Sequence, residues 1–221
     1  MKSVIVLGGC GAFGTRLSRR LSADGWSVLV AGRNQSKAAE LASQLPYARP
    51  LVADRERDLS PVLLRHRPFL LIDAAGPFQG SSYQVAEACI ANGVHYIDLA
   101  DARGFVAGMT SLDAAARRAG ITVVTGASSV PALSGAVVQR LAADMDDVRV
   151  VNLSISASNK ATAGASIAAA ILSYVGRPVR LWRGRRWVQE IGWRMLRWET
   201  YRVAGQSPIR RHEVAVDRAR R

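Results

Sequence analysis

One stretch near the start of the chain decides the fold. It spans residues 4–21 and has the sequence Val4-Ile5-Val6-Leu7-Gly8-Gly9-Cys10-Gly11-Ala12-Phe13-Gly14-Thr15-Arg16-Leu17-Ser18-Arg19-Arg20-Leu21. Its four leading apolar residues predict a strand buried on both faces, and two leucines spaced i, i+4 predict an amphipathic helix behind the glycines. In the order strand, turn, helix, the spacing Gly-x-Gly-x-x-Gly predicts dinucleotide binding.

Each glycine of this turn has a distinct expected role. Gly9 permits the tight turn, Gly11 lets the backbone approach a pyrophosphate, and Gly14 lets helix and strand pack closely. The unpaired N–H groups and the macrodipole at the start of the helix then favour phosphate charge. The candidate cofactor-binding residues here are Gly8, Gly9, Gly11, Ala12, Phe13 and Gly14.

The residues after the second strand indicate which dinucleotide is bound. Residues 27–31 predict that strand, and Arg33 and Asn34 follow it where NAD-binding proteins carry an acidic residue. A guanidinium can instead hydrogen-bond the 2′-phosphate of NADP and stack on the adenine. We therefore expect NADP, with Arg33 and Asn34 beside its adenosine half. Asp54, which ends a third expected strand at 49–54, either caps the next helix or faces the adenine.

Strands and helices alternate up to about residue 127. Further strands are expected at 69–78, 94–99 and 121–125, and helices at 37–45, 59–65, 81–92 and 112–119. This alternation predicts an α/β fold with a doubly wound parallel sheet over residues 1–127. Ligands of such sheets lie beyond the carboxyl ends of the strands. The chain after the fourth strand, Ala74-Ala75-Gly76-Pro77, is therefore expected to lie against the nicotinamide ribose.

The pattern changes after residue 127. We expect a helix from Ser128 or Ser129 to about residue 144, a half-buried strand at 148–156, a helix at 162–174 and a hairpin with arms 179–182 and 187–191. Residues 128–204 are thus predicted to form a partial α+β domain for substrate binding or dimerisation. Residues 205–221 have no apolar period and are expected to be a basic, poorly ordered tail.

Composition limits the function classes. The net charge of +13 is concentrated at the end of the chain, where residues 177–221 hold 13 arginines against four acidic residues. Two cysteines and a strand that begins directly after Met1-Lys2 favour a cytoplasmic protein with reduced thiols. No apolar run is long enough for a membrane span. His66 and His212 have no metal-like partners, so no metal site is expected.

Three blocks of sequence together resemble the saccharopine dehydrogenase-like family over residues 3–192. They are residues 8–14 with Ala31-Gly32-Arg33, residues 73–78 followed by 89–99, and Ser129-Val130-Pro131. The resemblance implies a Rossmann-type, NADP-dependent oxidoreductase that reduces an imine or oxidises a secondary amine of an amino-acid-like substrate. It also implies an acidic residue near Asp101. Because members of this family usually run longer, we expect the chain to be truncated at its carboxyl end.

Titratable side chains gather beyond the fifth strand. Tyr96 and Asp98 share one face by the period of two, and Asp101 and Arg103 follow in the next loop. Tyr96, Asp98 and Asp101 are the candidate proton carriers, and Arg103 is the candidate for binding a substrate carboxylate. Alternatively, Asp98 caps the strand end and the others are solvated. His95 points to the other face and is expected to be a packed or surface residue.

Two other functions stay open, and one is excluded. A short-chain reductase needs Tyr-x-x-x-Lys, and none of the five tyrosines has Lys four residues later. An NADP-binding regulatory or catalytically silent protein is an alternative. Basic residues interleaved with tryptophans in residues 180–198 suggest nucleic-acid binding, but these tryptophans also suit hairpin packing, so we expect a small-molecule substrate and no nucleic acid. A homodimer could form.

Overall fold

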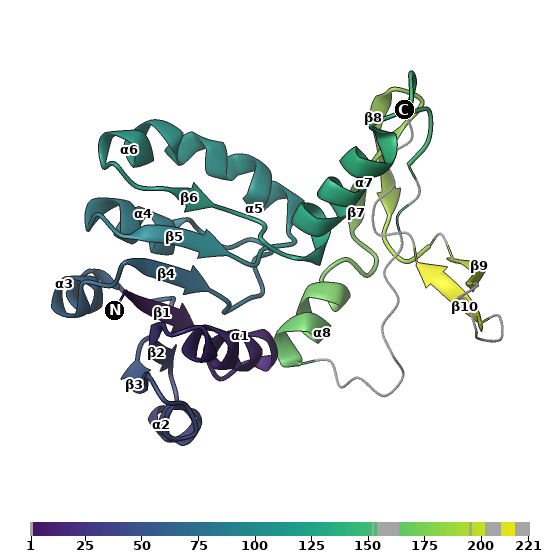
Figure 1. The fold of residues 1–221 in the computed structure, drawn as a ribbon. Coiled ribbons are helices and arrows are strands. Elements are labelled where there is room, and N and C mark those ends of the chain that lie inside the picture. Colours follow the sequence, from purple (N-terminus) through teal and green to yellow (C-terminus); the bar gives the residue numbers. More distant parts are fainter. Residues whose placement is uncertain (1, 152, 154–163, 195, 202–208, 215–221) are drawn as a thin grey trace. The chain divides into compact units, whose positions relative to one another are not determined.

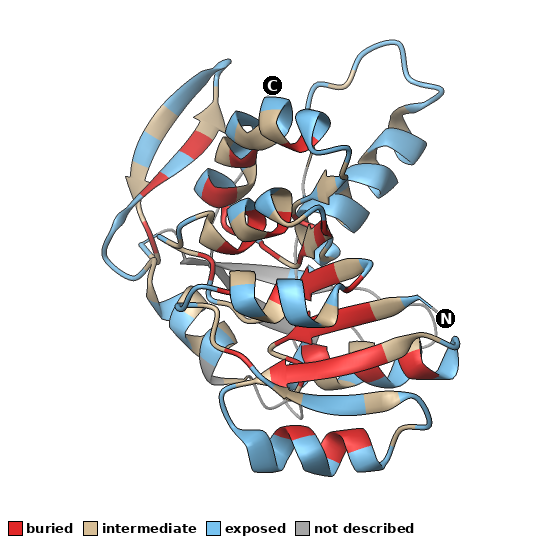
Figure 2. Ribbon diagram, turned by 90° about the vertical axis from the view of Figure 1, so that its left-hand side faces the viewer, coloured by how far each residue is buried: buried red, intermediate tan, exposed pale blue. Residues whose placement is uncertain are grey.

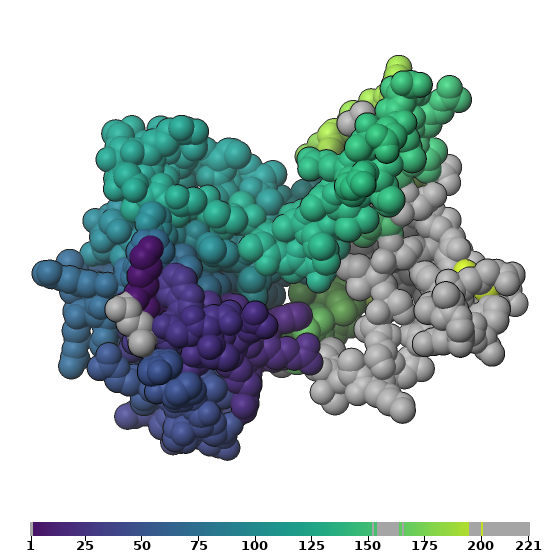
Figure 3. Space-filling view, viewed as in Figure 1, coloured from purple at the N-terminus to yellow at the C-terminus, as the bar shows by residue number. Residues whose placement is uncertain are grey.

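The protein divides into two compact units. The computed structural model describes residues 2–151, 153, 164–194, 196–201 and 209–214. The first unit consists of residues 1–133 with 164–167, and the second of residues 134–163 with 168–221. The domain boundary expected at residue 127 stays a prediction. Figure 3 shows that side chains close the spaces between the ribbons of the first unit, coloured purple to teal.

A six-stranded parallel sheet lies at the centre of the first unit (Figure 1). Its strands are β1 (Ser3–Leu7), β2 (Ser27–Gly32), β3 (Ala48–Val52), β4 (Leu70–Asp73), β5 (His95–Asp98) and β6 (Val123–Val124). Their order across the sheet is β3-β2-β1-β4-β5-β6. From β1 the chain adds β2 and β3 on one side, then crosses over and adds β4, β5 and β6 on the other side. This order confirms the doubly wound fold predicted from the sequence.

Helices cover both faces of the sheet. They are α1 (Ala12–Ala23), α2 (Gln35–Ser43), α3 (Ser60–His66), α4 (Gln84–Ala91), α5 (Arg103–Gly108) and α6 (Asp113–Arg118), with the short turn η1 (Met109–Leu112) between the last two. Alternate residues of β1 and β2 pack with α1 and α2 on one face, and the residues between them pack with α3, α4 and α5 on the other. Strands β1 and β2 are buried along almost their whole length, as their continuous apolar sequence requires, and Figure 2 colours the buried residues red.

Several elements of the structure differ from those expected. Helix α5 begins at Arg103, where a loop was expected. Strand β4 ends at Asp73, because the Asp73 side chain accepts a hydrogen bond from the Ala75 N–H and the chain turns there. The helix expected from Ser128 or Ser129 begins instead at Ser134, as α7 (Ser134–Ala142), after a single turn, η2 (Ser129–Leu133). Val130 in that turn has an extended backbone, because a proline disfavours helical geometry at the residue before it.

The second unit contains the predicted hairpin. Strands β7 (Pro178–Arg183) and β8 (Arg186–Ile191) pair antiparallel, and Gly184 and Arg185 between them both have positive φ, as a two-residue hairpin turn requires. The helix expected at 162–174 is found as α8 (Ala165–Leu172). Within the strand expected at 148–156, the described residues hold only an isolated bridge at Val150, and residues 152 and 154–156 lie outside the described part.

A further antiparallel pair joins β9 (Leu196–Tyr201) to β10 (Ile209–Val214). Strand β10 thus lies within the tail expected to be poorly ordered, whereas residues 205–208 and 215–221 lie outside the described part. Among the described residues, no helix is both long and apolar enough to span a membrane.

Candidate functional site

Close backbone contacts shape the turn between β1 and α1. Gly8 has a φ of +77°, and the Gly11 N–H donates to the Gly8 carbonyl at 2.8 Å. A Cβ on Gly9 would lie 2.9 Å from the Val6 carbonyl oxygen, and a Cβ on Gly14 would overlap the Gly8 carbonyl oxygen. The turn therefore has no room for side chains at these positions, as expected from the spacing of its glycines.

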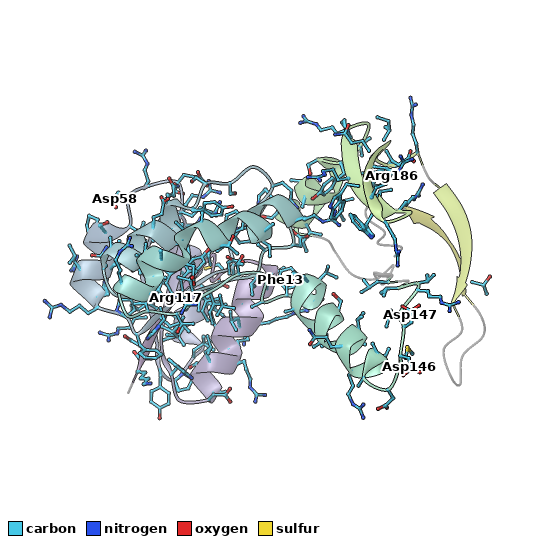
Figure 4. The ribbon with its side chains drawn as sticks, turned by 90° about the horizontal axis from the view of Figure 1, so that it is seen from above. Phe13, Asp58, Arg117, Asp146, Asp147 and Arg186 are labelled. Carbon is cyan, nitrogen blue, oxygen red and sulfur yellow. The ribbon has the colours of Figure 1, made fainter. Side chains whose placement is uncertain are left out.

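The start of α1 leaves its backbone donors available. Gly11 is the N-cap residue, it makes no side-chain cap, and the first turn holds no acidic residue. Phe13 lies at this end of the helix and is 54% exposed (Figure 4). An uncapped helix start behind a glycine turn is where a pyrophosphate binds in doubly wound sheets. The residues present therefore fit a dinucleotide.

The candidates for the adenosine half lie at the carboxyl ends of β2 and β3. Arg33 is exposed, one residue beyond β2. The Asn34 Oδ1 accepts a hydrogen bond from the Lys37 N–H at 2.9 Å, so Asn34 caps α2. The Asp54 Oδ1 accepts from the Glu56 N–H, and it is Asp58 that accepts from Ser60 at the start of α3. The suggestion that Asp54 caps α3 is therefore wrong; its role toward adenine stays a prediction.

The loop after β4 lies directly against the glycine turn. The Ala74 N–H donates to the Leu7 carbonyl at 2.9 Å. A Cβ on Gly8 would lie 2.9 Å from the Ala75 backbone, so Gly8 allows a close approach of two main chains. Gly76 and Pro77, joined by a cis peptide bond, continue the loop. The structure thus brings together two of the segments that the sequence offered for the cofactor, the glycine turn and residues 74–77.

Tyr96 and Asp98 are buried near the carboxyl end of β5 and are not open to a ligand. Tyr96 is 1% exposed and Asp98 is 0% exposed. Burial raises the pKa of the Tyr96 hydroxyl, and the nearby carboxylates of Asp73 and Asp98 raise it further. The Asp98 Oδ1 accepts hydrogen bonds from the Ala100 N–H, the Gly126 N–H and the Thr125 hydroxyl, between 2.8 and 3.0 Å. This geometry favours the structural alternative, in which Asp98 ties the end of β5 to the chain after β6.

Asp101 and Arg103 are exposed beyond β5. The Asp101 Oδ1 accepts a hydrogen bond from the Gln79 Nε2 at 3.1 Å, so the loops after β4 and β5 meet here. Arg103 is the first residue of α5. His95 is packed, as expected: its ring lies 4.7 Å from that of Phe69, and its Nδ1 accepts from the Thr122 N–H.

Sequence reasoning gave no role to a part-buried ion pair at the end of β4. The Arg55 Nη2 donates to the Asp73 Oδ2 at 3.1 Å, with side chains 12% and 0% exposed. Burial raises the pKa of the Asp73 carboxyl, and the Arg55 guanidinium opposes that rise. Arg55 lies in the run Arg55-Glu56-Arg57, which has the composition of a solvated loop. The signal that could have revealed it is Asp73 itself, a charged residue that ends an apolar strand.

The second unit has an open hollow of about 790 Å³ beside the hairpin. Asp147, Val148, Arg149, Trp182, Arg185 and Trp187 line it. The rings of Trp182 and Trp187 are packed edge to face at 5.1 Å, and the Arg180 guanidinium lies 5.0 Å from the Trp187 ring centre. Figure 4 labels Arg186 on this hairpin. No residue of the glycine turn lines the hollow.

Comparison with protein families identifies the chain. The family described as the saccharopine dehydrogenase NADP binding domain matches residues 4–124, more than half of the sequence. The protein belongs to this family. It therefore carries an NADP-binding oxidoreductase domain with a Rossmann fold, and its cofactor is NADP, as Arg33 and the resemblance predicted. No curated protein sequence matches it.

Several solved structures are similar to part of the chain. An oxidoreductase of the short-chain dehydrogenase/reductase family from Burkholderia thailandensis is 20% identical, with a TM-score of 0.45, over 63% of this chain and 74% of that chain. The 3-hydroxyacyl-CoA dehydrogenase type-2 from Mycobacterium avium is 23% identical, with a TM-score of 0.46, over 56% and 71%. A short-chain dehydrogenase from Sphingobium yanoikuyae in complex with NADPH is 18% identical, with a TM-score of 0.44, over 57% and 70%. At this level of similarity, the substrates and activities of these proteins cannot be transferred to this chain.

Proposed function

We propose that the protein is an NADP(H)-dependent oxidoreductase that transfers a hydride to or from a C–N bond of an amino-acid-like substrate. Its membership of the saccharopine dehydrogenase NADP binding domain family supports the reaction class. The observation that carries the proposal is the contact between the glycine turn and the loop after β4, with Arg33 beyond the adjacent strand. Oxidoreduction of this kind needs a positioned hydride donor and a route for a proton, and it needs neither a nucleophile nor a metal.

Each segment of this site has one task toward NADP. The N–H groups at the start of α1, in Ala12, Phe13 and Gly14, bind the pyrophosphate. Arg33 pairs with the 2′-phosphate, which no acidic residue in its loop repels. The segment 74–77 holds the nicotinamide ribose by its backbone, since small residues there allow close approach. When bound, NADP(H) supplies or accepts the hydride.

On the substrate side, the exposed groups take the chemical roles. Asp101 exchanges a proton with the substrate nitrogen, and Gln79 orients its carboxylate through their hydrogen bond. Arg103 binds a substrate carboxylate. Tyr96 and Asp98 are buried, which favours a role in supporting the strand ends over proton transfer to a substrate. Residues 128–204 form the substrate-binding or dimerisation part, and the protein works as a homodimer.

One observation also supports a second function, an NADP-binding protein without turnover. Two of the three residues that the sequence offered as proton carriers, Tyr96 and Asp98, are fully enclosed. In that case the protein reports the NADPH level through binding alone. The two functions differ in whether bound NADPH is ever oxidised.

A titration followed by a substrate screen tests the proposal. NADPH and NADH are titrated while nicotinamide fluorescence is followed, and pairs of amino acids and oxo acids are then screened for its loss. We expect NADPH to bind more tightly, and Arg33→Asp to abolish that preference by repelling the 2′-phosphate. Arg118→Asp, which makes the same charge change on exposed α6, is the control and should keep the preference. Equal affinities for both cofactors in the unmodified protein would contradict the proposal, and tight binding with no turnover would favour the second function.

A further inference from the structure

The loop of residues 74–81 must keep one position for the cofactor site to exist. Its first residues are in main-chain contact with Gly8, at distances that leave no room for a side chain there. Among the described residues, one hydrogen bond joins the loop to β1 and its turn, from the Ala74 N–H to the Leu7 carbonyl, and the other contacts are van der Waals contacts, which hold a loop weakly. Other groups must therefore fix where the loop lies.

Arg55 contacts this loop at both of its ends. Its Nη2 donates to the Asp73 Oδ2 at 3.1 Å, and the Asp73 Oδ1 in turn accepts from the Ala75 N–H at 3.0 Å. Its Nη1 donates to the Ser81 hydroxyl at 3.1 Å, and that hydroxyl donates to the Pro77 carbonyl at 3.0 Å. One planar guanidinium thus links the start of the loop to its end.

Packing fixes the guanidinium itself. It lies 5.2 Å from the centre of the Phe78 ring, and Phe78 is buried in the core. The Gln84 side chain donates to the Arg55 carbonyl at 2.6 Å, which connects the backbone of Arg55 to α4. A largely buried guanidinium with two hydrogen-bond partners is preorganised for a forked contact, so it can hold the loop in one position.

We infer that Arg55 is a positioning residue for the nicotinamide half of the cofactor. Its hydrogen bonds connect Asp73, directly before the loop 74–81, to Ser81 at the end of the loop. They thereby keep Ala74 and Ala75 in contact with the Gly8 turn. This rests on the proposed function, in which residues 74–77 hold the nicotinamide ribose. Without these hydrogen bonds, the loop must be ordered each time NADPH binds, and the affinity falls by the cost of that ordering. The adenosine half, bound by α1 and Arg33, does not depend on the loop.

Two ligands separate positioning from general damage. Binding of NADPH and of adenosine 2′,5′-bisphosphate, which lacks the nicotinamide half, is measured by calorimetry for the unmodified full chain and for its variants. We expect Arg55→Met to weaken NADPH binding by about tenfold or more, while adenosine 2′,5′-bisphosphate stays within about twofold. Arg55→Lys should recover part of the loss, because an ammonium can reach one of the two partners but cannot fork. Arg57→Met, an exposed arginine of the same loop, should change neither.

Ser81→Ala provides a second, milder route to the same result. It removes the hydroxyl that links Arg55 to Pro77 and keeps the ion pair, so it should weaken NADPH binding alone even if Arg55→Met does not fold. Equal loss of both ligands in Arg55→Met and Ser81→Ala, or no loss of either, would overturn the positioning role. If the unmodified protein binds adenosine 2′,5′-bisphosphate but gains nothing from the nicotinamide half, the inference also fails. If it binds neither ligand, the proposed function itself is wrong, and the inference is lost with it.

Discussion

Adding one methyl group at Gly14 tests whether close packing of α1 on β1 builds the cofactor turn. A Cβ there would lie 2.8 Å from both the Gly8 carbonyl carbon and the Gly9 Cα, and would overlap the Gly8 carbonyl oxygen. All three atoms belong to the backbone, so no side-chain rotation can relieve the contact. Helix α1 must move away from the turn, or the turn must open.

The expected change in the free energy of unfolding has two opposed contributions. Overpacking a rigid site costs about 3 kcal/mol, at the upper end of the usual range because the obstacle is backbone. Replacing glycine by alanine within a helix returns up to about 1 kcal/mol. Gly14→Ala should therefore lower the free energy of unfolding by about 2 kcal/mol. NADPH binding should weaken by about tenfold or more, because the N–H groups of α1 move with the helix.

Gly104→Ala is the matched control. Gly104 lies in the first turn of α5, and its Cβ would meet nothing within 4 Å. That variant should be as stable as the unmodified protein, or up to about 1 kcal/mol more stable. Urea unfolding followed by far-ultraviolet circular dichroism, and NADPH titration, measure both variants. If Gly14→Ala matches Gly104→Ala in stability and in NADPH affinity, the packing argument is refuted.

Other outcomes follow from the buried groups and the hairpin turn. Burial, with a smaller contribution from a nearby carboxylate, raises the pKa of Cys89 to about 12 from 9.0, so the folded protein retains a proton that the unfolded chain loses. Stability should therefore fall as the pH rises from 9 toward 12, by at most about 1.4 kcal/mol per pH unit, and Cys89→Ala should reduce that slope in urea titrations. Asp98→Ala leaves two buried N–H donors and the part-buried Thr125 hydroxyl without their acceptor and should cost about 3 kcal/mol or more. Asp101→Ala on the surface should cost under about 0.5 kcal/mol, and equal costs would argue against the structural role of Asp98. Arg185→Asn should raise the melting temperature by relieving about 1 kcal/mol of strain at a φ of +60°, and Arg186→Asn in β8 should lower it.

The cofactor half of the site could be predicted because its signals are local. A strand, a glycine turn and a helix follow one another within residues 3–23, and the roles of Gly9, Gly11 and Gly14 depend on neighbours a few residues away. The nature of the residue after β2 is equally local, and it indicated NADP before any fold was known. The alternation of apolar strands and amphipathic helices then determined the doubly wound sheet.

The tertiary structure alone decided which polar residues are open to a ligand. The period of two placed Tyr96 and Asp98 on one face, but a period cannot tell whether other segments cover that face. The donors to the Asp98 Oδ1 include Thr125 and Gly126, 27 and 28 residues along the chain, and they help to enclose it. Likewise Arg55 meets Asp73 across 18 residues, although its sequence neighbours suggest a solvated loop. Contacts between distant segments are set by how the sheet winds, and for that reason the sequence determined the glycine turn while only the fold separated the buried carboxylates from the exposed Asp101.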